Sequence, residues 1–166
     1  YRSRGKQMTS RMMQKQNIEG ASHGNDFLYP ELSYKIRGAI FKVWKALGPA
    51  FKEVAYQRAL AKEFRNYGLA FVAEQRLEIR YDGEVVGHYR PDFVIEDKIL
   101  LEVKVLPFLS KREEVQLWHY LKGSPYRVAM LVNFGGQRLG IKRWIYARAR
   151  EKYQRLTECR CTISPK

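Results

Sequence analysis

Between residues 30 and 67, apolar residues recur every three to four positions, which is the spacing of an amphipathic helix. One run begins near Pro30 and ends at Gly48-Pro49, and a second run covers residues 51–67. Proline suits the first turn of a helix, and glycine is favoured just after the last turn. The pattern therefore predicts two consecutive helices.

After residue 70 the period changes to two, which is typical of half-buried strands. Asp82-Gly83 is a strong turn signal between the first two strands. Ser110 and Glu113 form a capping box for a third helix, which ends at Lys122. Strands are predicted over residues 71–81, 84–95, 98–106, 126–134 and 139–147. The order α-α-β-β-β-α-β-β predicts one α/β domain with a central mixed sheet flanked by helices.

The chain of 166 residues has a net charge of +14, and much of the basic excess lies in its two end segments. Residues 1–26 contain five basic and two acidic residues, and residues 141–166 contain eight and two. Such an excess favours a polyanionic partner, most often nucleic acid, although it could serve only to increase solubility. We predict a disordered basic leader over residues 1–26, a folded domain over 27–148 and a basic C-terminal tail over 149–166.

Several classes of protein are not expected. The longest stretch without a charge has ten residues, half of what a membrane-spanning helix needs, and the first thirty residues contain no apolar block of a secretory signal. Cys159 and Cys161 fit neither a zinc pattern nor a disulfide framework, which favours a reducing, cytoplasmic location. The three histidines are far apart, so any metal would be held by oxygen ligands. A homodimer is left open.

The strand over residues 98–106 has an unusual pattern. Its ends are apolar on both faces, which is typical of a central strand, yet one face carries Glu102 and Lys104 in the middle. Charged side chains are rarely buried in such a strand unless they are paired or bind something. Residues two apart project from the same face about 6.6 Å from each other, so both can act on one object. An ordinary ion pair within the strand is the alternative.

A second carboxylate is expected beside this pair. Counting back from Glu102 through the turn at Glu96-Asp97 places Asp92 next to it on the neighbouring strand. Two adjacent carboxylates repel each other unless a cation lies between them. Mg²⁺ is commonly held by one or two carboxylates, with water and substrate phosphate as its other ligands. Such an ion and the Lys104 ammonium are parts that phosphodiester hydrolysis needs.

Pro91-Asp92, followed nine residues later by Glu102-Val103-Lys104, resembles the motif of the PD-(D/E)XK nuclease superfamily. On the third helix, Gln116 and Tyr120 are similar to the Gln-x-x-x-Tyr element of its RecB-like branch. These two positions share one helix face because they are four residues apart.

An earlier segment resembles the signature of the GxxExxY protein family. Gly48 opens it, Glu53 and Tyr56 are retained, and Ala50 stands where the family has a glycine. Together these motifs imply a restriction-endonuclease-like fold. They also imply a nuclease, dependent on Mg²⁺ or Mn²⁺, that hydrolyses phosphodiester bonds in DNA.

The resemblance also implies residue roles. Asp92, Glu102, the Val103 carbonyl and Glu53 would bind the metal, and Lys104 would position the attacking water. Gln116 and Tyr120 would arrange the substrate backbone and Lys104.

Three further residues are predicted to contact nucleic acid: Arg90, His88 and Tyr56. Arg90 could instead pair with Glu78, and His88 could simply face solvent. Two other functions are open. The chain could be a catalytically inactive nucleic-acid-binding module on the same fold, or an interaction protein whose basic ends bind an acidic partner.

Overall fold

A five-stranded mixed sheet forms the centre of the protein, in the strand order β1-β4-β5-β6-β7, and β2 and β3 form a separate two-stranded sheet. This computed structural model describes residues 28–82 and 84–146. The helices are α2 (Pro30–Leu47), α3 (Glu53–Asn66) and α4 (Lys111–Gly123). The strands are β1 (Phe71–Ala73), β2 (Leu77–Tyr81), β3 (Glu84–Tyr89), β4 (Phe93–Ile95), β5 (Ile99–Lys104), β6 (Val128–Asn133) and β7 (Gly140–Ile145). The fold class predicted from the sequence is confirmed.

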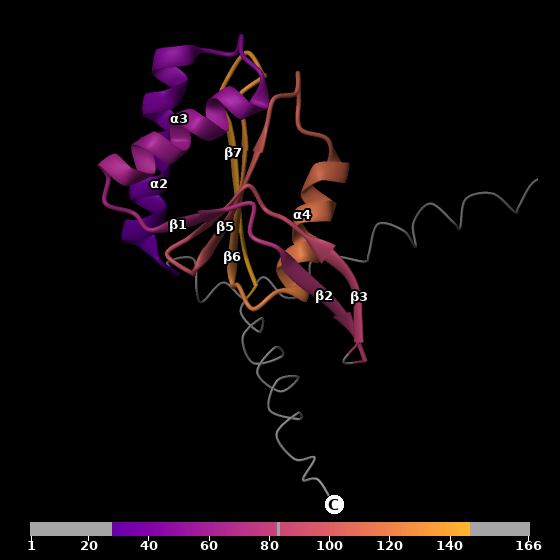
Figure 1. Cartoon of the computed structure of the whole chain (residues 1–166). Helices are drawn as coiled ribbons and strands as arrows, with labels where there is room; N and C mark the ends of the chain where they lie inside the picture. Colours follow the sequence, from indigo (N-terminus) through magenta and orange to yellow (C-terminus); the bar gives the residue numbers. More distant parts are fainter. Residues whose placement is uncertain (1–27, 83, 147–166) are drawn as a thin grey trace, which may run out of the picture.

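The helices cover both faces of the central sheet (Figure 1), with α2 and α3 on one face and α4 on the other. Ile99, Leu101 and Val103 of β5 are fully buried among the side chains of α2 and α3. Leu100 points to the opposite face and packs with Leu117 and other residues of α4. Both faces of β5 are therefore covered, as its apolar ends predict.

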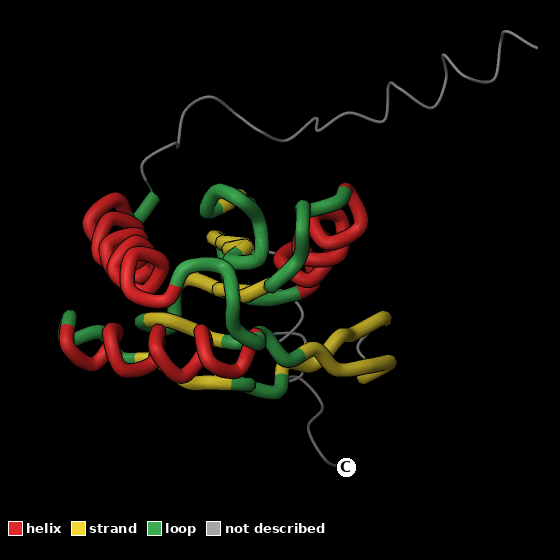
Figure 2. The backbone as a smooth tube through the Cα atoms, turned by 90° about the horizontal axis from the view of Figure 1, so that it is seen from above, coloured by secondary structure: helices red, strands yellow, loops and turns green. Residues whose placement is uncertain are grey.

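The β2–β3 hairpin projects from the body beside α4 (Figure 2). Leu77 and Ile79 pack against the α4 side of the core, whereas Val85 and Val86 near the turn are exposed. Asp82 has a φ of 48°, the left-handed backbone that the predicted turn requires.

Two strands that the sequence predicts as continuous are each divided between the two sheets. Residues 71–81 form β1 and β2, separated at Glu74, whose φ is 50°. Residues 84–95 form β3 and β4, separated at Pro91, which cannot donate a hydrogen bond to a sheet. The prediction of two continuous strands is wrong here, because an alternating pattern does not reveal where a segment stops pairing with one strand and starts pairing with another.

The helix ends follow the predicted punctuation. Gly48 ends α2 with a φ of 64°, which glycine adopts without strain. Ser110 and Glu113 form the predicted capping box at the start of α4. None of the helices in residues 28–146 that the structure describes is long and apolar enough to cross a membrane. The predicted leader, the tail and both cysteines lie outside the described residues.

Candidate active site

The pairing of β4 with β5 brings two carboxylates together. Phe93 lies opposite Leu101, so Asp92, one position before β4, lies next to Glu102. The Val103 backbone N–H donates a hydrogen bond of 2.6 Å to Asp92 Oδ2. This adjacency agrees with the position counted from the sequence.

Glu102 is held between two donors. Lys104 Nζ lies 2.8 Å from Glu102 Oε1, and the Tyr89 hydroxyl donates a hydrogen bond of 2.8 Å to Glu102 Oε2. The side chains of Glu102 and Lys104 are only 18% and 25% exposed. The ion pair within the strand therefore exists, but it forms part of a larger, half-buried cluster.

Helix α3 supplies the fourth partner. Gln57 Nε2 donates a hydrogen bond of 2.8 Å to Asp92 Oδ1. Each of the four carboxylate oxygens of Asp92 and Glu102 thus accepts a hydrogen bond from the protein. Glu53 lies one turn before Gln57 in α3, and its charge affects the pKa values of both Asp92 and Lys104.

The surroundings make Asp92 a weak acid for a carboxyl group. Burial and the negative charge of Glu102 raise its pKa to about 7, and Glu53 adds to this effect. The Val103 N–H and the Lys104 charge act in the opposite direction but do not cancel the increase. A carboxylate pair whose charges repel in this way is a suitable place for a cation.

Lys104 remains a cation in this cluster. Burial lowers its pKa, but the hydrogen bond and charge of Glu102 raise it more, with help from Glu53 and Asp92, so the net shift is upward. An ammonium group has three donors. One is used by Glu102, and the others are available for a further acceptor such as water or phosphate.

Two tyrosines join this cluster to α4. The rings of Tyr89 and Tyr120 stack with centroids 3.7 Å apart and planes 10° apart. Gln116 Nε2 donates a hydrogen bond of 3.1 Å to the Tyr120 hydroxyl. Burial and the charge of Glu102 raise the pKa of Tyr89 well above its usual range, so its hydroxyl stays protonated and donates.

Two of these residues, Tyr89 and Gln57, are absent from the site that the sequence predicts. Gln57 is four residues after Glu53, so their shared helix face could have indicated it. No sequence signal places the Tyr89 side chain, because its direction depends on the break between β3 and β4.

Tyr56 lies in the core rather than on the predicted nucleic-acid surface. It is completely buried and stacks on Phe134, with ring centroids 4.4 Å apart. Its hydroxyl donates a hydrogen bond to the Gly48 carbonyl and accepts one of 3.2 Å from the Phe51 N–H. The prediction of direct nucleic-acid contact is therefore wrong. Tyr56 instead fixes the loop that precedes Glu53.

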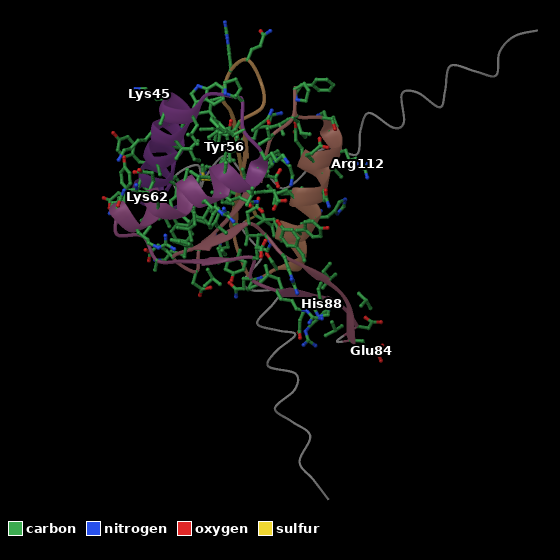
Figure 3. All side chains as sticks on the ribbon, turned by 45° about the horizontal axis from the view of Figure 1, so that its top comes forward. Lys45, Tyr56, Lys62, Glu84, His88 and Arg112 are labelled. Carbon is green, nitrogen blue, oxygen red and sulfur yellow. The ribbon has the colours of Figure 1, made fainter. Side chains whose placement is uncertain are left out.

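His88 and Arg90 are both exposed. Figure 3 shows His88 on the projecting hairpin together with Glu84, whereas Tyr56 lies on α3. His88 Nδ1 lies 3.1 Å from a guanidinium nitrogen of Arg76. Glu78, the alternative partner of Arg90, pairs with Arg80.

The end of β5 is fixed by the last residue of β6 and by the loop that follows it. The buried Asn133 side chain accepts a hydrogen bond of 2.9 Å from the Leu106 N–H and donates one of 2.8 Å to the Leu106 carbonyl. Gly135 packs so closely that a Cβ there would lie 2.5 Å from the Leu106 nitrogen. This close packing gives Lys104 a fixed position at the end of the strand.

The donor set fits a hard cation that takes few of its ligands from the protein. Among residues 28–82 and 84–146, no three His, Cys, Asp or Glu side chains are grouped closely enough to hold a metal ion. Glu53 stays a predicted metal ligand, and the structure shows that its charge raises the pKa values of Asp92 and Lys104. Mg²⁺ needs only one or two carboxylates because water and phosphate fill its other positions, so Asp92 and Glu102 suffice.

A comparison with protein-family models gives a match over most of the described residues. The family model described as the PD-(D/E)XK nuclease superfamily matches residues 30–144, which include the helices and strands of the central fold. The chain belongs to the PD-(D/E)XK nuclease superfamily. Searches among curated proteins and among solved structures each found no significant match.

Membership of the PD-(D/E)XK superfamily agrees with the mixed central sheet and its flanking helices. It supports a hydrolytic nuclease, and hence a nucleic-acid substrate. Nucleases of this superfamily generally use divalent metal ions. The paired carboxylates of Asp92 and Glu102 offer the oxygen ligands that hard divalent ions prefer.

Proposed function

We propose that this protein is a Mg²⁺-dependent deoxyribonuclease, with Mn²⁺ as an alternative ion, whose active site is formed by Asp92, Glu102 and Lys104. The observation that supports this most strongly is that the pairing of β4 with β5 brings the repelling carboxylates of Asp92 and Glu102 together beside the cationic Lys104. Two carboxylates held side by side against their mutual repulsion reduce the stability of the folded protein, which a purely structural role would not require.

Asp92 and Glu102 would hold the metal, with the Val103 carbonyl as a further ligand. A bound ion of this kind stabilises negative charge on a phosphoryl oxygen and lowers the pKa of bound water. The Lys104 ammonium would position the attacking water and offset the charge that develops on the phosphate. Glu53 would add negative potential beside the pair and so favour the cation.

The motifs of the sequence support a finer placement. The segment from Gly48 to Tyr56 supports the GxxExxY family, and Gln116 with Tyr120 supports the RecB-like branch. Tyr56 would act in this signature by fixing the loop before Glu53. The excess of basic residues supports a long polyanionic substrate, which would be held mainly through its phosphates.

The rival function is a nucleic-acid-binding module without catalysis. One observation favours it, since all four carboxylate oxygens already accept hydrogen bonds from the protein. An oxygen with one hydrogen bond retains a second lone pair, however, so these bonds do not prevent metal binding.

A cleavage assay separates the two functions. The full-length protein is incubated with circular and linear DNA, single-stranded and double-stranded, and with matched RNA. Each substrate is tested with Mg²⁺, with Mn²⁺ and with EDTA. Metal-dependent cleavage of DNA is expected. Binding that persists in EDTA, without cleavage under any condition, would instead establish the module.

A further inference from the structure

The Tyr89 side chain connects α4 to the proposed active site. It is 8% exposed, its ring stacks on Tyr120 of α4, and its hydroxyl donates to Glu102 Oε2 at 2.8 Å. Gln116 in turn donates to the Tyr120 hydroxyl. A continuous series of contacts therefore runs from an exposed side chain of α4 to a carboxylate of the site.

We propose that Tyr89 is a positioning residue that sets the orientation of the Glu102 carboxylate, and that Tyr120 acts on the site by supporting the Tyr89 ring. This inference rests on the proposed function, in which Glu102 binds the metal. It gives Tyr120 a role through Glu102 rather than through a direct contact with substrate or Lys104.

The physical reason lies in the end of the glutamate side chain. The terminal torsion of glutamate has a broad, roughly two-fold energy profile, so an unrestrained carboxylate occupies many orientations. Lys104 holds Oε1 and Tyr89 holds Oε2, and two donors on opposite oxygens fix this rotation. The second lone pair of each oxygen is then kept in one direction, which is the requirement for a defined metal site.

The stacked ring gives Tyr89 its own fixed position. Tyr89 belongs to the buried cluster that contains Leu117 and Leu121 of α4. Because the planes of Tyr89 and Tyr120 are nearly parallel, the Tyr120 ring limits how far the phenol can tilt away from Glu102. Removal of the ring should therefore matter more than removal of the Tyr120 hydroxyl.

The first test compares Tyr89→Phe with Tyr126→Phe. Tyr126 is a matched control because it is 5% exposed in the same cluster and its hydroxyl donates to another carboxylate, that of Asp97. Tyr89→Phe should lower kcat by about tenfold or more while KM for DNA changes little, and it should weaken Mg²⁺ binding measured by calorimetry. Tyr126→Phe should leave kcat, KM for DNA and the affinity for Mg²⁺ unchanged. Equal effects of the two variants would overturn the proposal.

The second test separates the two parts of Tyr120. Tyr120→Phe keeps the stacked ring and loses the bond from Gln116, whereas Tyr120→Leu loses the ring. Tyr120→Leu should lower kcat clearly more than Tyr120→Phe does, and it should add little to the loss already caused by Tyr89→Phe. A loss of kcat in Tyr120→Phe equal to that in Tyr120→Leu would overturn the supporting role of the ring.

The third test does not depend on activity. Unfolding by urea in EDTA is measured for Tyr89→Phe, Glu102→Gln and the double variant. If Tyr89 restrains Glu102, the double variant should unfold at a midpoint clearly above that expected from adding the two single shifts. If wild type cleaves DNA but the two shifts in urea midpoint are additive, only the role of Tyr89 is overturned. A wild type that cleaves no substrate would overturn the proposed function and this role with it.

Discussion

Two strands of this protein carry a glutamate and a basic residue two positions later, and their surroundings differ. On β2, Glu78 pairs with Arg80, and the Glu78 side chain is 42% exposed. On β5, Glu102 pairs with Lys104 and is 18% exposed. The first pair lies on a projecting hairpin (Figure 2), and the second lies at the centre of the main sheet.

The difference shows what distinguishes a site from an ordinary ion pair. Exposed pairs contribute about 0–1 kcal/mol to stability and are screened by salt. Glu102 has in addition a buried tyrosine donor and a second carboxylate, Asp92, whose pKa it raises. The spacing of charges is therefore the same in both places, and burial beside a like charge is what sets the β5 pair apart.

The largest expected effect concerns cleavage. Asp92→Ala, Glu102→Ala and Lys104→Ala should each lower the cleavage rate by roughly a thousandfold or more, because under the proposed function each removes a group that would act at the reacting phosphate. Glu78→Ala, in the exposed pair, should leave the rate unchanged. DNA binding should persist in all four variants, since phosphate contacts elsewhere hold the polymer.

This prediction has a clear counter-result. Cleavage at the wild-type rate by purified Glu102→Ala protein would show that β5 does not contribute to the active site. Double substitutions among Asp92, Glu102 and Lys104 should cost hardly more than single ones, because the three groups act as a unit.

A second contrast compares one glycine in each region. Gly135→Ala places a Cβ 2.5 Å from the Leu106 nitrogen, so the backbone at the end of β5 must shift, at a cost of about 1–3 kcal/mol in unfolding free energy. Gly87→Ala on the hairpin meets only Ile79, at 3.7 Å, and should be nearly neutral. Urea unfolding measures both changes. Equal stabilities of the two variants would show that the end of β5 is not tightly packed.

A third contrast uses pH in the absence of metal. The pKa of Asp92 is about 7 in the folded protein, against an ordinary value of 3.8, so the folded state binds the proton more tightly than the unfolded state. The stability that Asp92 contributes is complete below about pH 4 and is lost as the pH rises through about 7.

At pH 8 in EDTA, Asp92→Asn should therefore melt above wild type. We expect about 2–4 °C, the change that about 1 kcal/mol produces in a protein of this size. The difference should shrink as the pH falls toward 4, and Glu78→Gln should not raise the melting temperature. A variant that melts below wild type at pH 8 would mean that the Asp92 carboxylate is stabilised in the folded protein.

Much of the fold could be predicted from the sequence. Helical spacing, Gly48 and the Ser110 capping box are local signals, and the structure confirms the elements that they predict. The position of Asp92 beside Glu102 could be counted because only one tight turn separates their strands. Pro91 could have indicated a break in its strand, because proline cannot donate a hydrogen bond to a sheet. The break at Glu74 could not be predicted, because it depends on which sheet each half of the strand joins.

The site was harder to predict where it depends on distant packing. The sequence predicts a nucleic-acid contact for Tyr56, but stacking on Phe134, far away in the sequence, puts its ring in the core. Tyr89 was missed for a similar reason, since its partner Tyr120 lies on another element. Side chains that act through long-range contacts leave no periodic signal in the sequence.

The most direct test of the central claim is the change in stability that Mg²⁺ causes. Wild type, Asp92→Asn, Glu102→Gln and Glu78→Gln are melted in EDTA and in a series of Mg²⁺ concentrations. Wild type and Glu78→Gln should gain about 1.4 kcal/mol when the ion is at ten times its Kd, whereas Asp92→Asn and Glu102→Gln should lose most of that gain. If Mg²⁺ leaves wild type unchanged and Glu102→Gln is destabilised in EDTA, the pair on β5 is a structural ion pair and the account is contradicted.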